Sequence, residues 1–212
     1  MTEGLRELKK RQTRQRISSV ATGLFVERGF DQVTIAEVAA AAQVSVNTIY
    51  NYFPAKEDLV LPPEEASPRR LADIVRGRAP GESAAGALLG RLRAEVHGRD
   101  PRLGLTEGFP RVFAMMRAAP TLTARLEKLG QQMTEELAAV LAEETGAAPD
   151  DPAPRLVAAQ LGSVHALVFT EIGRRTTAGE SPDTIAGAVI RLLDAAESLL
   201  GEPLLGYAVR KD

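Results

Sequence analysis

Residues 34 to 61 read TIAEVAAAAQVSVNTIYNYFPAKEDLVL, and the architecture of this chain is most readily worked out from them. Thr34 is followed three residues later by Glu37, the spacing of a capping box, so we expect a helix to begin there. Ser45 can cap a second helix in the same way. The three residues 42–44 are enough for a sharp turn and too few for a loop. The spacing therefore predicts two helices joined by a tight turn.

The two faces of the second helix follow from its period. Ile49 and Phe53 are four residues apart, and we expect their face to pack on Val38, Ala39 and Val44. Asn can pair with adenine, Thr with a base edge or a phosphate, and Val with a thymine methyl group. The pattern favours a helix that enters the DNA major groove. The alternative is an ordinary helical hairpin, which is a common motif. The outward residues are Val46, Asn47, Thr48, Tyr50 and Asn51.

Groups suited to phosphate surround this helix. The hydroxyls of Tyr50 and Tyr52 match phosphate oxygens, and Lys56 stands where the next helix begins. Residues 1 to 16 carry a net charge of +4, which leaves −6 for the rest of the chain. A pI near 5.8 argues against indiscriminate nucleic-acid binding. A charge run is often only a solvated face, but this one lies where a phosphate backbone would need it.

The helix after the basic run has one apolar stripe at helical spacing. Gly29 is suited to end this helix. Phe30 and Val33 are expected to complete a small core beneath the hairpin. We therefore expect a three-helix module. The stripe comprises Ile17, Val20, Ala21, Leu24 and Phe25.

Together these residues resemble the signature of the tetracycline-repressor (TetR) family of bacterial transcription regulators. The resemblance covers roughly residues 14 to 61. The rest of the chain agrees only in its length and its all-helical pattern. The matching positions are Arg16-Ile17, Leu24-Phe25, Glu27-Arg28-Gly29-Phe30, Thr34, Val38-Ala39, Val44-Ser45, Thr48-Ile49-Tyr50, Tyr52-Phe53-Pro54 and Lys56-Glu57-Asp58-Leu59.

The resemblance implies a dimer of all-helical subunits, each with a DNA-binding domain and a larger domain that binds a small molecule and the partner subunit. It assigns Val46, Asn47 and Thr48 to base reading. The remaining residues that we assign to the interface with double-stranded DNA are Thr34, Ser45, Tyr50, Asn51, Tyr52 and Lys56.

Three positions depart from the family pattern. Gln43 stands where the family usually has a turn glycine, so a non-glycine residue is expected to hold a positive φ at a cost of about 1 kcal/mol. Asn47 occupies a position that often has a smaller residue. Ala55 replaces a capping serine, which weakens the start of the fourth helix by about 1 kcal/mol.

The pattern predicts an all-α fold with a helix-turn-helix domain at 1–61 and a larger helical domain at 62–212, which the resemblance implies is regulatory. Pro62-Pro63 is expected to break or shorten the connection between them, either as a kinked connector or as the start of a loop. Ser67-Pro68 resembles the cap and first position of a resumed helix. Further helices are expected at about 68–76, 83–97, 106–118, 121–145, 155–175 and 182–200.

The last two helices, about 155–175 and 182–200, mix large apolar residues with small ones that permit close approach. We expect them to pair with their symmetry mates as a four-helix bundle in a homodimer. The alternative is that they only close the core of their own subunit. A small-molecule effector would bind between helices of the larger domain. Candidate lining residues, each more often core than pocket, are Phe109, Phe113, Met116, Met133, His165 and Phe169.

Several function classes find no support. Cysteine is absent, so disulfides and thiolate metal sites are excluded. Two histidines without metal-ligand spacing, and no nucleophile elbow or phosphate-binding loop, lead us to expect neither an enzyme, nor a metal, nor a cofactor. No window approaches about 20 apolar residues, so we expect no membrane association. No secretory segment follows the basic N-terminus, so we expect a cytoplasmic location.

We therefore expect a ligand-responsive transcriptional repressor that binds a pseudo-palindromic operator as a dimer. One alternative is a helical small-molecule-binding protein whose hairpin does not read DNA. Another is a transcriptional activator with the same fold. Substitution of Tyr50 and Lys56 separates a regulator from the first alternative. A regulator should lose salt-dependent DNA binding, whereas a protein whose hairpin does not read DNA has no such binding to lose.

Overall fold

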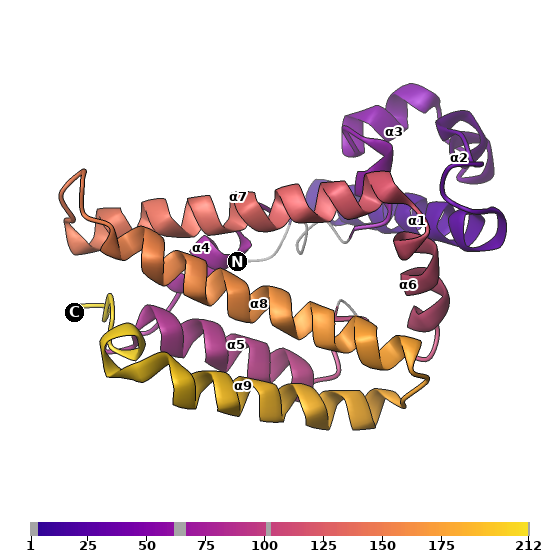
Figure 1. Cartoon of the computed structure of the whole chain (residues 1–212). Coiled ribbons are helices and arrows are strands. Elements are labelled where there is room, and N and C mark those ends of the chain that lie inside the picture. The colour runs from indigo at the N-terminus through magenta and orange to yellow at the C-terminus, as the bar shows by residue number, and fades with distance from the viewer. Residues whose placement is uncertain (1–3, 62–66, 101–102, 212) are drawn as a thin grey trace. The chain divides into compact units, whose positions relative to one another are not determined.

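The computed structural model of the chain describes residues 4–61, 67–100 and 103–211. Over these ranges every regular element is helical and no strand is present, which confirms the predicted all-α class (Figure 1). Contacts divide the chain into two compact units. Unit 1 comprises residues 1–66 and 111–125, and unit 2 comprises residues 67–110 and 126–212. Contacts alone do not define which segments fold independently, so the domain boundary after Leu61 stays a prediction.

Unit 1 contains the predicted helix-turn-helix. Its elements are α1 (Leu5–Arg28), α2 (Ile35–Ala41), α3 (Val46–Tyr52) and the short 3₁₀ helix η1 (Lys56–Leu59). It also includes most of α6 (Phe109–Arg117) and the first turn and a half of α7 (Pro120–Thr145). Helix α1 ends as expected at Gly29, whose φ of 87° lies in the region that glycine tolerates.

The core of unit 1 confirms the predicted apolar stripe. Ile17, Ala21 and Phe25 from α1 are fully buried against Ile49 and Phe53. Three residues from the range that we assigned to the regulatory domain, 62–212, belong to the same cluster. Their burial joins the α6–α7 corner to the core of the helix-turn-helix. These residues are Met115, Ala119 and Leu122.

Unit 2 contains α4 (Arg70–Arg76), α5 (Ala84–His97), the rest of α7, α8 (Ala153–Thr177) and α9 (Pro182–Leu205). Helix α5 packs against α4, α8 and α9, and α8 packs along α9 (Figure 1). Ser83 and Ser181 cap α5 and α9 by accepting the N–H groups of Gly86 and Thr184. Fully buried side chains include Leu88, Leu92, Leu137, Leu161, Val168 and Val189.

Two predicted helix starts are wrong. Helix α4 begins at Arg70 rather than near residue 68, because the Ser67 hydroxyl accepts the Arg69 N–H in a local turn. Helix α6 begins at Phe109 rather than 106, since Phe109 N–H bonds Thr106 O in a turn that contains Gly108, a poor helix former. The predicted break at Pro62-Pro63 lies outside the described residues.

The end of the chain is bonded to the loop between α4 and α5. Gly201 breaks the helical geometry of α9 with a φ of 70°, and the following residues turn back. Arg78, only 4% exposed, donates to Ala208 O at 2.7 Å and to the carboxylate of Glu144 at 2.5 Å. Arg210 donates in turn to Arg76 O at 3.1 Å, the carbonyl at the last residue of α4.

Helix α8 corrects one expectation from the sequence. By length and composition it is a candidate membrane span, the only one found among the residues that the structure describes. Its side chains on one face, including Leu161 and Val168, are nevertheless buried in unit 2. A core helix of a water-soluble protein meets the same criteria, so this helix does not by itself establish a membrane span.

Candidate nucleic-acid interface

Helix α2 begins with the capping box that the sequence predicted. The Thr34 hydroxyl accepts the Glu37 N–H at 3.2 Å, and the Glu37 carboxylate accepts the Thr34 N–H at 2.8 Å. Arg28, in the last turn of α1, pairs with the same carboxylate. The Thr34 amide, followed by Arg28, lowers the pKa of Glu37 to about 2. The start of α2 is thus fixed by an ionised side chain across the physiological pH range.

The turn between α2 and α3 is a Schellman motif. Val44 N–H bonds Ala39 O at 3.0 Å, and Gln43 N–H bonds Ala40 O at 3.1 Å. Gln43 occupies the left-handed position of the motif with a φ of 53°, as we predicted for a non-glycine residue at this site. The turn therefore closes the two helices tightly, at the cost of a strained glutamine.

Helix α3 separates a buried face from an exposed one. The Ser45 hydroxyl caps it by accepting the Thr48 N–H at 3.0 Å. Ile49 is buried, while Tyr50 is 51% exposed and Val46 41% exposed. The predicted outward set is accessible, although Thr48 is half-buried and its hydroxyl bonds that of Ser45. The DNA contacts of these residues, and those of Thr34, Asn47, Asn51 and Tyr52, stay predictions.

Lys56 has partners within the protein. Its ammonium donates to Phe30 O at 2.6 Å and lies 4.4 Å from the centroid of the Phe30 ring. This contact closes the connection between α1 and α2, a role that the sequence did not suggest, and its phosphate contact stays a prediction. Ala55 provides no side-chain cap for η1, as expected; its N–H instead donates to the Asp58 carboxylate at 3.1 Å.

The predicted effector-binding residues fall into both units. Phe113 and Met116 belong to unit 1, where Met116 packs on the helix-turn-helix core. The other four belong to unit 2, where the rings of His165 and Phe169 lie 5.0 Å apart. Met133 is buried, and Phe109 is half-buried with its ring against Gly104, where a Cβ atom would clash. The ligand roles of all six stay predictions.

His165 is unusual among these residues. Its Nε2 atom is buried and has no hydrogen-bond partner among the described residues, although an edge of the side chain stays accessible. Burial, followed by the nearby charge of Arg70, lowers the pKa of His165 to about 4. The ring is therefore neutral at physiological pH.

Two features of the structure escaped the sequence analysis. One is the buried ion pair in which Arg70 donates to Glu95 at 2.7 Å, while Arg91 donates to the other oxygen of Glu95 at 2.6 Å. The signal was present, since a charged residue stands in the apolar pattern at both 70 and 95. The other is a groove of about 420 Å³ in unit 1, between the end of α1 and α6, with Phe30 and Arg111 in its lining. None of the six predicted effector-binding residues lines it.

Comparison with known proteins identifies the module. Residues 17–61 match the model of "Bacterial regulatory proteins, tetR family". The chain is 32% identical over 174 residues to the HTH-type transcriptional regulator TcmR of Streptomyces glaucescens. This alignment covers 79% of this chain and 76% of TcmR. It is also 45% identical over 47 residues to the HTH-type transcriptional regulator LuxR of Vibrio harveyi. This shorter alignment covers 22% of this chain and 23% of LuxR.

A solved structure shows the same fold. NalD of Pseudomonas aeruginosa, the secondary repressor of the MexAB-OprM multidrug efflux pump, superposes with a TM-score of 0.52 at 20% identity. The alignment covers 88% of this chain and 97% of NalD. The likeness in fold therefore extends beyond the helix-turn-helix to the helices of unit 2.

Proposed function

Because the chain belongs to the TetR family of bacterial regulatory proteins, we propose that it acts as a ligand-responsive repressor that binds a pseudo-palindromic operator as a homodimer. The chain is a DNA-binding transcriptional regulator, as its relatives are. The proposal adds the direction of regulation, the partner subunit and the effector. It includes no catalytic activity, and it places the protein in the cytoplasm.

The accessible face of α3 carries the proposal. A capped helix behind a tight turn presents Val46, Asn47 and Tyr50 to solvent, without a charged residue among them. Asn47 can pair with adenine and Val46 with a thymine methyl group, while the Tyr50 hydroxyl suits a phosphate oxygen. In a two-fold dimer, two such helices would occupy successive major grooves about 34 Å apart.

Exposed leucines on α8 and α9 support a homodimer. Leu156 and Leu167 on α8 are 62% and 51% exposed, and Leu199 on α9 is 85% exposed. Leu156, Ser163 and Leu167 are separated by seven and four residues, so they share one helix face, with small residues between the leucines. A face of this composition suits close pairing with its symmetry mate.

The effector is expected to act on unit 2. A small molecule that binds better to the conformer with wrongly spaced recognition helices would release the dimer from DNA. The extent of release cannot exceed the ligand's preference for that conformer. Among the predicted effector-binding residues, the neutral His165 ring and the Phe169 ring lie side by side. Together they offer a ligand one polar and one aromatic group.

Footprinting on the promoter of the chain's own gene and on neighbouring intergenic regions tests this function. We expect two protected half-sites of related inverted sequence about one helical turn apart. A reporter driven by that promoter should rise in activity when the gene is deleted. Absence of a protected palindrome would count against operator binding, and a fall in reporter activity would identify an activator.

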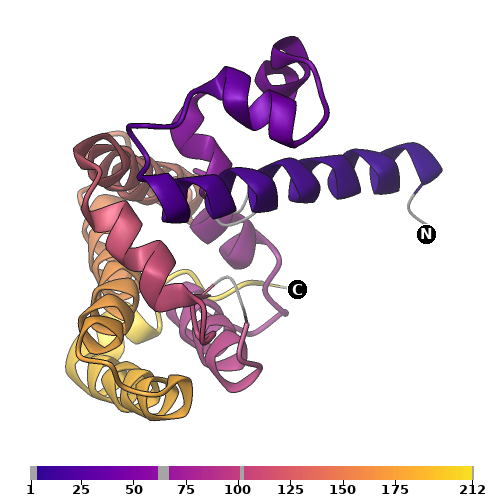
Figure 2. The same ribbon diagram turned by 90° about the vertical axis from the view of Figure 1, so that its right-hand side faces the viewer.

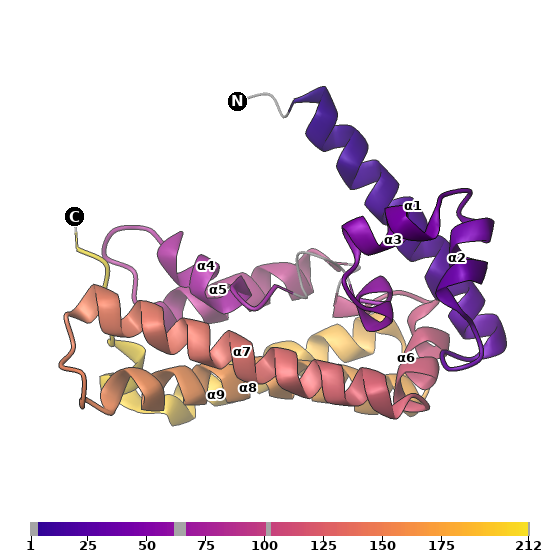
Figure 3. The ribbon, with the colours of Figure 1, turned by 90° about the horizontal axis from the view of Figure 1, so that it is seen from above.

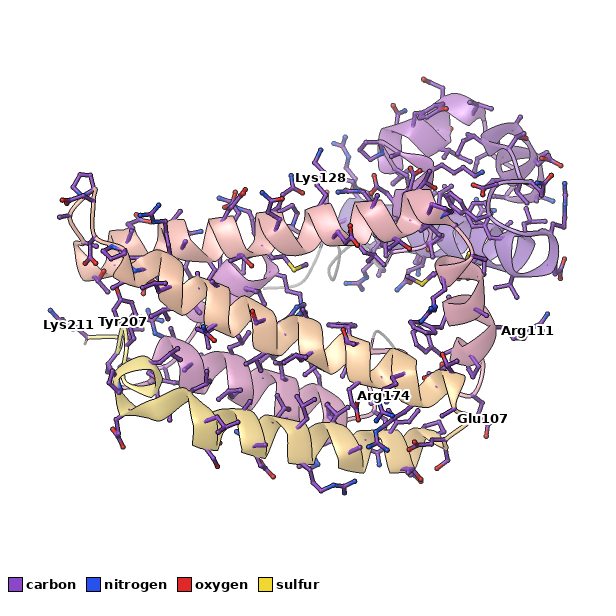
Figure 4. All side chains as sticks on the ribbon, viewed as in Figure 1. Glu107, Arg111, Lys128, Arg174, Tyr207 and Lys211 are labelled. Atoms are coloured by element: carbon purple, nitrogen blue, oxygen red, sulfur yellow. The ribbon has the colours of Figure 1, made fainter. Side chains whose placement is uncertain are left out.

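Substitution of the exposed leucines tests the dimer. Leu167→Glu with Leu199→Glu should yield monomers by light scattering and weaken operator binding. Lys128→Glu on the exposed side of α7 is the control and should leave both unchanged (Figure 4). Retention of a dimer by the leucine variant would place the interface elsewhere.

A further inference from the structure

Helix α1 begins well before the core that it packs against. It starts at Leu5, and the first fully buried side chain among those that the structure describes in this helix is Ile17. Twelve helical residues therefore precede Ile17, a length of about 18 Å. Figures 2 and 3 show these turns extending past α2 and α3 within unit 1. Packing in the described structure does not explain why this extension is helical and basic.

One row of side chains along α1 faces the end of the recognition helix. Arg6, Lys10, Arg14 and Ser18 follow one another at four-residue intervals and so share a face. The Ser18 hydroxyl donates to Leu59 O at 2.7 Å. The Arg14 guanidinium lies 5.3 Å from the centroid of the Phe53 ring, directly after α3. These two contacts fix the direction of the whole row.

Arg14 retains an unused donor. Its Nε atom is buried and has no hydrogen-bond partner among the described residues. The face of the Phe53 ring contacts the guanidinium in a cation–π interaction, which does not neutralise its positive charge. Because Nε is shielded, the half-buried Arg14 would donate to a phosphate oxygen through the terminal nitrogens of its guanidinium.

Lys10 and Arg6 continue the row beyond Arg14. At 1.5 Å per residue they lie about 6 and 12 Å further along the helix axis, and both are exposed. Among residues 4–16 Glu7 is the single acidic residue against six basic ones. The rest of the chain is net negative, so the positive potential of this surface is local rather than general.

We propose that the N-terminal half of α1 is a second DNA-contacting element, in which Arg6, Lys10 and Arg14 bind phosphodiester groups flanking the base pairs that α3 reads. The proposal rests on the DNA-binding function above and adds three contact residues to it. A 12 Å row spans on the order of three base pairs of one strand. Phosphate contacts carry no sequence information, so this element raises affinity and salt dependence without changing which bases are preferred.

A variant with two substitutions tests the proposal in the full-length chain. Arg6→Gln with Lys10→Gln removes two exposed charges and keeps a good helix-forming residue at each position. The probe is a duplex selected by the wild-type protein from a random-sequence pool, together with the same duplex trimmed to its palindrome. On the long duplex the variant should bind at least about tenfold more weakly near 0.1 M salt. The slope of log K against log salt should fall by about 2 for each bound subunit.

Three further measurements make the result specific. Trimming the flanks should weaken the wild type and leave the variant unchanged, and both proteins should select the same sequence. Lys128→Gln with Lys211→Gln removes the same charge from unit 2 and should retain wild-type affinity (Figure 4). Circular dichroism should show equal helix content and Tm for all three proteins.

Wild-type affinity and salt slope in the Arg6→Gln, Lys10→Gln variant would overturn the proposal. So would unchanged DNA binding accompanied by lost binding to anionic phospholipid vesicles, which would assign the basic row to a membrane surface. If the wild type itself selects no sequence, the function proposed for α3 fails instead, and the two failures are distinct.

Discussion

Arg125 donates two hydrogen bonds, at 2.9 and 3.1 Å, to a single carboxylate oxygen of Asp58, whose other oxygen accepts the Ala55 N–H. Asp58 therefore starts η1 and also holds it to the first turns of α7. Both side chains are largely shielded from water, at 14% and 27% exposure. The start of η1, which lacks a capping serine, is thus supported by Arg125 through Asp58, two residues that lie 67 positions apart in the sequence.

Arg125→Gln should lower the free energy of unfolding by about 1–2 kcal/mol, because it leaves the half-buried Asp58 carboxylate without its charged partner. A double-mutant cycle with Asp58→Asn, measured by urea denaturation, should give a coupling energy on the order of 1 kcal/mol. The exposed pair of Arg76 and Glu143 is the control, and Arg76→Gln should cost less than about 0.5 kcal/mol. Equal losses at the two pairs would show that shielding at Asp58 has no energetic consequence.

Gln43→Gly should stabilise the protein by about 0.5–1 kcal/mol, since glycine holds the observed φ of 53° without steric cost. The matched control is Gln15→Gly at an exposed position inside α1, which should destabilise by about 1 kcal/mol. Thermal denaturation should show a higher Tm for Gln43→Gly and a lower Tm for Gln15→Gly than for the wild type. A loss of stability at both positions would mean that the left-handed conformation of Gln43 is not a source of strain.

Tyr50→Phe should weaken operator binding several-fold and leave Tm unchanged, because the exposed hydroxyl contacts nothing that it would leave unsatisfied in the free protein. The loss corresponds to one hydrogen bond of about 1 kcal/mol. Affinity is measured by fluorescence anisotropy on the selected duplex. A protein whose hairpin does not read DNA would show no affinity to lose.

Lys56→Ala should behave differently, because its ammonium bonds Phe30 O and lies over the Phe30 ring. We expect it to lower the free energy of unfolding by about 1 kcal/mol or more. Lys56→Arg, which keeps the charge, should retain more of that stability. An unchanged Tm in Lys56→Ala with weakened DNA binding would show that the phosphate contact is its main role.

His165 should make the protein less stable in mild acid. Its folded-state pKa of about 4 lies below the ordinary value of 6.5. Between these two values the unfolded chain binds a proton that the folded chain does not, so the free energy of unfolding falls as pH drops from about 6.5. At pH 5 the loss is on the order of 2 kcal/mol relative to pH 7.5.

Urea denaturation of the wild type and His165→Gln at pH 7.5 and 5.0 measures this effect. The Arg174 and Arg175 side chains lower the pKa of Glu171 to about 2, so the stability that this carboxylate contributes is fully present only above its ordinary pKa of 4.5 and is lost below it. Between pH 7.5 and 5.0 the stability contributed by Glu171 therefore changes little. The difference between the two pH values should be smaller in the variant. Identical pH dependence in both proteins would exclude His165 as its source.

The local signals in this sequence predicted the helix-turn-helix well. Capping by Thr34 and Ser45, and a left-handed Gln43, depend on neighbours within a few residues, and all three are confirmed. The burial of Ile17 and Ile49 followed from helical periodicity, which identifies the face that a helix buries.

Periodicity does not identify the element that covers a face. Leu122 lies within the helix predicted at 121–145, but nothing in its spacing distinguishes the core of unit 1 from that of unit 2. The Lys56 contact with Phe30 O joins residues 26 positions apart, so it could be identified only from the folded structure. The same holds for Arg70 and Glu95, whose pairing removes the cost of burying either charge alone.

The Arg210 bond to Arg76 O joins residues 134 positions apart, which has a consequence for the order in which the protein forms during synthesis. The last carbonyl of α4 cannot receive this donor until residue 210 has emerged from the ribosome. Domains fold as units as they emerge, so α4 and the loop after it must wait longest for their partners. Chains whose synthesis stops before Arg210 would leave this loop without its partner and would therefore expose it to the proteases that clear incomplete products.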